Sequence, residues 1–152
     1  KHYTVGIITT IIRKSLLSEL NSPFNSKYNI IGDFDLIIKL SLNNKFACIQ
    51  APLAYYRIHQ TNYSSINYES EIEELEDWLK NQVIFDKSKF ENLLKNIKLK
   101  ILYMQTINYI LNGNLKNAIK NIFFFPLGIK KIKLITTLFL TKKMLKKIKK
   151  FN

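Results

Sequence analysis

Apolar residues recur at helical spacing throughout the second half of the chain. The segment that follows Asn67 combines apolar positions three or four residues apart with acids in its first turns, which suit the positive end of a helix dipole. Ser88 then begins a capping box, and the apolar spacing continues to Leu111. The pattern therefore predicts an acid-rich helix after Asn67 and a long helix over 88–111.

Further breaks divide the remaining residues. Gly113 is typical of a helix end and Asn114 of a helix start, and Pro126 ends the segment that begins at Leu115. The last part of the chain places aliphatic residues opposite six lysines: Lys142, Lys143, Lys146, Lys147, Lys149 and Lys150. This pattern predicts a basic amphipathic helix. The uncharged run between Lys133 and Lys142 is too short for a membrane span, which needs about 20 apolar residues.

The first 66 residues have a mixed pattern. Segments 3–12, 46–50 and 52–58 are rich in β-branched and aromatic residues and predict short strands. Segments 13–20 and 33–43 predict short helices, the second of which begins at an acidic cluster. The expected fold class is α+β and mostly α, divided into a mixed region (1–66), a helical extension (67–126) and a basic amphipathic tail (127–152).

Charge is distributed unevenly along the chain. Residues 1–85 contain 8 Lys or Arg against 9 Asp or Glu, whereas the other residues contain 16 Lys against 2 acids, within a net charge of +13. This asymmetry predicts an anionic partner for the tail. Nucleic acid is not the expected partner, because the lysines alternate with aliphatic residues and the tail has almost no arginine or interleaved aromatic residues of the kind that stack on bases.

Two motifs in the first 66 residues carry candidate chemistry. Residues 32–36 read GDFDL, and residues 51–65 read APLAYYRIHQTNYSS. Together they resemble the second half of the catalytic domain in family 2 glycosyltransferases, which are inverting enzymes with a GT-A fold and nucleotide-sugar donors. The resemblance covers about residues 4–66. It implies that residues 1–66 are the C-terminal remnant of a GT-A α/β domain.

The resemblance assigns a role to each polar residue of the two motifs. Asp33 would be the catalytic base, which takes the proton of the acceptor hydroxyl during inverting transfer. Asp35 would be an acceptor-binding or structural residue, and Arg57 and His59 would lie near the donor phosphates or a metal ion. The alternative is that both aspartates only cap a helix, while Arg57 forms a surface salt bridge and His59 an ordinary hydrogen bond.

The resemblance also implies cofactors and partners. The intact enzyme would use Mg²⁺ or Mn²⁺, a nucleotide-sugar donor, and a polysaccharide or lipid-linked acceptor from surface-glycan synthesis. The sequence begins at Lys1 without an initiator methionine and does not contain the donor half with its own D-x-D motif. We therefore expect a fragment of a longer protein that is inactive and binds no divalent cation in isolation.

The single cysteine and the basic tail indicate where in the cell we expect to find the protein. Cys48 is the single cysteine and cannot form an internal disulfide, which favours a reducing compartment. The tail lysines favour an anionic membrane surface, so the expected location is cytoplasmic and peripheral at the inner face of the membrane. The alternative function is a non-catalytic peripheral membrane-binding helical module, in which Asp33 is only a helix cap.

Overall fold

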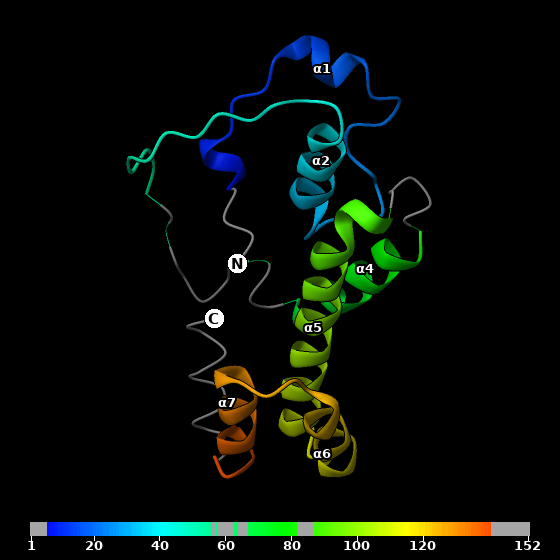
Figure 1. The fold of residues 1–152 in the computed structure, drawn as a ribbon, viewed down its shortest axis with the longest axis vertical. Coiled ribbons are helices and arrows are strands. Elements are labelled where there is room, and N and C mark those ends of the chain that lie inside the picture. The colour runs from blue at the N-terminus through cyan, green and yellow to red at the C-terminus, as the bar shows by residue number, and fades with distance from the viewer. Residues whose placement is uncertain (1–5, 56, 58–62, 64–66, 82–86, 141–152) are drawn as a thin grey trace. The chain divides into compact units, whose positions relative to one another are not determined.

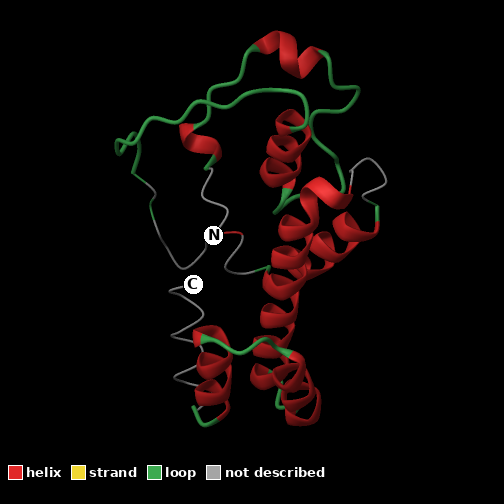
Figure 2. Ribbon diagram, in the orientation of Figure 1, coloured by secondary structure: helices red, strands yellow, loops and turns green. Residues whose placement is uncertain are grey.

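The computed structural model describes residues 6–55, 57, 63, 67–81 and 87–140 (Figures 1 and 2). The chain divides into two compact units, residues 1–62 and residues 63–152. Within the described ranges every regular element is a helix, as Figure 2 shows. The protein is therefore all-α in the part that the structure describes.

The predicted α+β fold class, with short strands from a GT-A remnant, is wrong. Residues Ile7–Thr9 form a 3-10 helix (η1), and the hydroxyls of Thr9 and Thr10 donate hydrogen bonds to the Gly6 carbonyl. Segments 46–50 and 52–55 have no regular structure, and their side chains are exposed. A strand needs a neighbouring strand to satisfy its backbone N–H and C=O groups, and the described part of the first unit provides none.

The first unit contains two helices at predicted positions. Helix α1 spans Lys14–Ser18, and helix α2 spans Gly32–Ser41. One face of α2 is buried and consists mainly of apolar side chains: Phe34, Leu36, Ile37 and Leu40. Its first turn carries two aspartates and its last turn carries Lys39, an order of charges that matches the helix dipole.

The second unit is built on one long helix. Helices α4 (Tyr68–Lys80), α6 (Leu115–Phe124) and α7 (Ile129–Leu138) each pack against α5 (Lys87–Leu111), and α6 also contacts α7 (Figure 1). The predicted acid-rich helix, the long helix and the helix ended by Pro126 are all confirmed. The six tail lysines, from Lys142 to Lys150, lie outside the described residues.

The turn between α5 and α6 also follows its prediction. Gly113 has a φ of 77°, a left-handed conformation that strains residues with a Cβ atom. Asn114 caps α6, since its side-chain oxygen accepts a hydrogen bond from the backbone N–H of Asn117 at 3.3 Å. These two residues reverse the chain so that α6 folds back against α5.

One part of the core of the second unit lies where α5, α6 and α7 meet, and buried side chains of α4 and α5 such as Trp78 and Ile101 form another part. Ile122, Phe125 and Leu134 are buried together, and the rings of Tyr103 and Phe125 meet edge to face with centroids 6.2 Å apart. Apolar side chains of α5 and α7 surround them: Leu99, Leu102, Tyr103, Ile107 and Leu138. Apolar burial of this kind is the main stabilising contribution to such a three-helix arrangement.

Candidate functional site

Asp33 lies in the first turn of α2 and is half-buried. Its Oδ1 accepts a hydrogen bond from the backbone N–H of the next residue, Phe34, at 2.7 Å. No lysine or arginine in the described ranges forms an ion pair with it. The carboxylate is therefore held in place through one oxygen, and no described residue forms a hydrogen bond or ion pair with the other oxygen.

Asp35 lies two residues further on and is held differently. It is only 4% exposed, and its Oδ2 is 2.7 Å from Nζ of Lys39, one turn along the helix. Lys39 also donates a hydrogen bond to the carbonyl of Ser22 at 3.1 Å. Lys39 thereby joins α2 to the loop that follows α1 and also holds the Asp35 carboxylate.

The second motif has less regular surroundings. Arg57 is exposed in an irregular segment, and His59 lies outside the described residues. Cys48, in the same segment, is also exposed, and its sulfur accepts a hydrogen bond from Nε2 of Gln50 at 3.3 Å. Residues 46–55 and Arg57, the described part of this region, are exposed and form no regular secondary structure.

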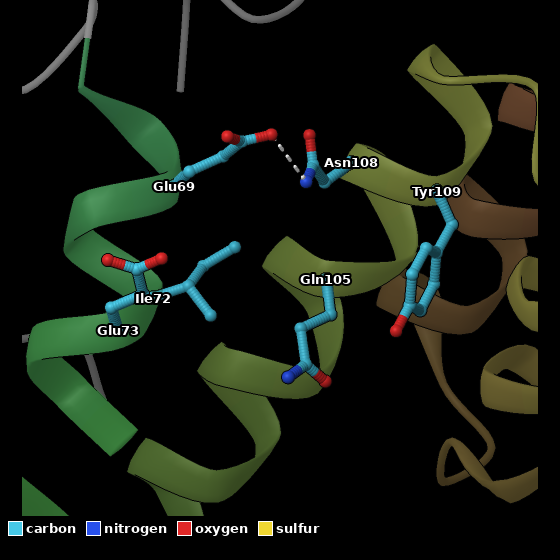
Figure 3. A pocket seen from close by; sticks show the side chains of 6 residues that line it. All are labelled: Glu69, Ile72, Glu73, Gln105, Asn108 and Tyr109. Carbon is cyan, nitrogen blue, oxygen red and sulfur yellow. Dashed lines mark hydrogen bonds between the residues drawn. The ribbon is translucent and has the colours of Figure 1, made fainter. Parts of the chain in front are cut away.

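Sequence reasoning did not identify a shallow cleft between α4 and α5, which Figure 3 shows from close by. The cleft measures about 170 Å³ and is lined by six residues: Glu69, Ile72 and Glu73 from α4, and Gln105, Asn108 and Tyr109 from α5. Asn108 Nδ2 donates to Glu69 Oε1 at 3.0 Å, and Gln105 Nε2 donates to Glu76 Oε1 at 2.6 Å. Because the amide donors are bonded to glutamates, these groups serve to hold the two helices together.

A tyrosine pair lies near this α4–α5 interface. Burial raises the pKa of Tyr68 well above its usual range, and the negative charge of Glu71 and the nearby Tyr103 raise it further. Burial also raises the pKa of Tyr103. Glu71 in turn pairs with Lys100 at 2.6 Å. Both phenols are therefore held in their neutral form within the folded unit.

We expect the protein to lose stability above pH 10, and part of that loss to come from Tyr68. The pKa of Tyr68 is about 10 in the unfolded chain and higher in the folded one, so its contribution is complete below pH 10 and disappears as pH rises through the folded value. Tyr68→Phe removes this titration. Between about pH 9 and pH 11, the free energy of unfolding should fall by about 1 kcal/mol less in the variant.

Urea unfolding at each pH measures the free energy of unfolding of both proteins. Their difference at pH 7 gives the effect of losing the hydroxyl itself, and it is subtracted from the differences at higher pH. Equal slopes in the two proteins would show that Tyr68 is not buried as described.

Two features are absent from the described part of the chain. No group of three or more His, Cys, Asp or Glu side chains is gathered there in a way that would hold a metal ion. None of the helices in the described ranges combines the length and the apolar character needed to cross a bilayer.

No family model, curated protein or solved structure matches this chain.

Proposed function

We propose that this chain carries the acceptor-activating part of an inverting glycosyltransferase similar to family 2, with Asp33 as the general base. The observation that carries the proposal is the difference between the two aspartates of the GDFDL motif. Asp35 is buried and paired with Lys39, whereas Asp33 is half-buried and has one carboxylate oxygen that no described residue bonds. The proposal rests on this site and its motif, because fold and function are separable.

The geometry suits proton abstraction. A general base must come within hydrogen-bond distance of the hydroxyl that it deprotonates, with its own position fixed. The Phe34 N–H fixes Oδ1 of Asp33, so Oδ2 can accept the proton of the acceptor hydroxyl. The acceptor oxygen then forms a bond to the anomeric carbon from the face opposite the nucleotide, and the nucleoside diphosphate leaves.

Other residues of the motifs have supporting functions in this proposal. Lys39 holds Asp35, and its hydrogen bond to the Ser22 carbonyl anchors the helix that presents Asp33. Arg57 supplies a positive charge for the donor phosphates, and His59 a ring nitrogen for the same region or for Mg²⁺ or Mn²⁺. The donor is a nucleotide sugar, and the acceptor is a surface-glycan precursor at the cytoplasmic face of the membrane.

A transfer assay tests the proposal. The full-length protein that contains this chain is incubated with a panel of nucleotide sugars, Mn²⁺ or Mg²⁺ and a membrane-lipid extract. We expect release of nucleoside diphosphate that requires both the extract and one of the donors. Absence of turnover with every donor, in a protein that is folded and binds lipid vesicles, would favour the non-catalytic membrane-binding module instead.

A further inference from the structure

Helix α6 exposes an apolar stripe in addition to its buried face. Leu115, Ile119 and Phe123 follow one another at intervals of four residues and are all exposed, Phe123 by 77%. Ala118 and Ile122 lie on the side that packs into the core. Leu115, Ile119 and Phe123 therefore do not contribute to the core, although they are apolar.

Helix α7 and the link before it continue this pattern. Leu127 in the link, Ile129 and Ile132 on α7, and Phe139 at the C-cap of α7 are exposed. Leu134, on the opposite side of α7, is fully buried. We call the exposed apolar residues of both helices and their link the α6–α7 surface: Leu115, Ile119, Phe123, Phe124, Leu127, Ile129, Ile132, Ile135 and Phe139. A solvent-facing helix side is normally polar, so this density of apolar side chains indicates a binding surface.

The charge of these helices has a single sign. Four exposed lysines accompany the α6–α7 surface, Lys116, Lys120, Lys130 and Lys133, and no acidic residue occurs in the sequence after Glu91. A fifth, Lys131, is half-buried and donates hydrogen bonds to the carbonyls of Phe123 and Phe125 at 3.1 and 2.8 Å. It closes the end of α6 and fixes the corner between the two helices.

We propose that the α6–α7 surface binds an anionic lipid surface, with its apolar side chains inserted at the level of the headgroups and its four exposed lysines paired with lipid phosphates. Amphipathic helices with aromatic and aliphatic residues on one side and lysines beside them bind bilayers in this way. Each lysine near such a surface adds favourable electrostatic energy. This site is distinct from the tail lysines after Leu140, and it does not depend on the proposed glycosyl transfer.

Charge argues against the same surface of a second copy as the occupant, and packing argues against the acidic face of its α4 and α5. The same surface on a second molecule would bring lysines against lysines. The acidic helix α4 would attract the lysines, but α4 and α5 expose no large apolar side chain within their described residues, so they cannot cover the apolar stripe. Lipid provides both the negative charge and the apolar environment.

A tryptophan reporter tests the proposal in the full chain. Trp78 is the only tryptophan and is 1% exposed, so its emission should change little on binding. Phe123→Trp places a second indole on the α6–α7 surface. We expect its emission to shift to shorter wavelength with vesicles that contain about 30% anionic lipid, much less with neutral vesicles, and less again at high salt. Tyr55→Trp, at a fully exposed position outside the surface, should not shift.

Two sets of substitutions then separate this site from the tail. Ile119→Ser combined with Ile132→Ser should weaken vesicle binding at least about tenfold, because two exposed apolar side chains no longer insert. Ile49→Ser, at a 70% exposed position in the first unit, is the matched control and should have no effect. Changing the six tail lysines to glutamine should leave the Phe123→Trp shift in place, although binding becomes weaker.

Circular dichroism confirms that each variant remains helical. The proposal is overturned if binding disappears with the tail lysines and is unaffected by the Ile119 and Ile132 substitutions. It is equally overturned if light scattering shows a lipid-free dimer that the same two substitutions dissociate, because the occupant is then a second copy.

Discussion

Asp33→Asn should lower glycosyl transfer by the full-length protein roughly 10²-fold or more, with little change in folding. Asparagine has nearly the same size as aspartate, and its side-chain oxygen can still accept the hydrogen bond from the Phe34 N–H. The change therefore keeps the geometry of the first turn and removes only the group that accepts the proton. Initial rates under saturating donor and acceptor measure the effect.

Asp35→Asn is the matched comparison, because it makes the same chemical change two residues away. It breaks the ion pair with Lys39 in a buried position, so we expect it to lower the free energy of unfolding by about 1 to 3 kcal/mol. Turnover per folded molecule should fall far less than in Asp33→Asn. Lys39→Met should reproduce the loss of stability and likewise preserve most of the turnover.

This set of variants separates catalysis from structure. Small and equal losses of turnover in Asp33→Asn and Asp35→Asn would show that both carboxylates are structural, and the proposed function would then be wrong.

Leu134→Ala should lower the free energy of unfolding by about 2 to 5 kcal/mol. Leu134 is fully buried among Ile122, Phe125 and side chains of α5, so its truncation removes apolar contacts and leaves a cavity that rigid neighbours cannot fill. Guanidinium unfolding, followed by circular dichroism, measures the change. Ile132→Ala removes a similar volume from the same helix at a 61% exposed position and should change the value by less than about 0.5 kcal/mol.

The contrast between these two variants tests how α7 is oriented. If both substitutions have the same cost, α7 does not present Leu134 to the core and Ile132 to the outside, and the α6–α7 surface would lose its structural basis.

The helices could be predicted because their signals are local. Apolar spacing, Gly113, Asn114 and Pro126 determine the boundaries of α5 and α6 within a few residues of sequence. Helix α7 was not separated from the tail, because its lysines alternate with aliphatic residues and no Ser, Thr, Asp or Asn precedes it as a cap. Its signal was the combination of Gly128 and apolar residues three positions apart, Ile129, Ile132 and Ile135.

The strands could not be predicted correctly from the same kind of pattern. β-branched and aromatic residues indicate only that a segment suits a pleated surface, and a ladder depends on a partner that local sequence does not reveal. In segment 7–10 the threonine hydroxyls bond instead to the Gly6 carbonyl and support a 3-10 turn. In segment 46–55 the described residues contain no neighbour that could form a ladder.

In the candidate site, too, local features could be predicted from the sequence and tertiary contacts could not. The position of Asp33 at a helix start followed from the sequence, and the spacing of Asp35 and Lys39, four residues apart on a helix, was a readable sign of their ion pair. The contact between Lys39 and the Ser22 carbonyl, and the cleft between α4 and α5, depend on tertiary packing. No pattern within a single element indicates which residues of two elements face each other.

The two hydrogen bonds of Lys131 have a consequence for how this sequence can diverge. Arginine can replace Lys116, Lys120, Lys130 or Lys133, since only a positive charge is needed at these exposed positions. The side chain at position 131 is half-buried and must also donate hydrogen bonds to the carbonyls of Phe123 and Phe125. The compact ammonium group of lysine can make both bonds. Homologous chains that keep the α6–α7 corner should therefore interchange Lys and Arg freely at the four exposed sites and retain Lys at position 131.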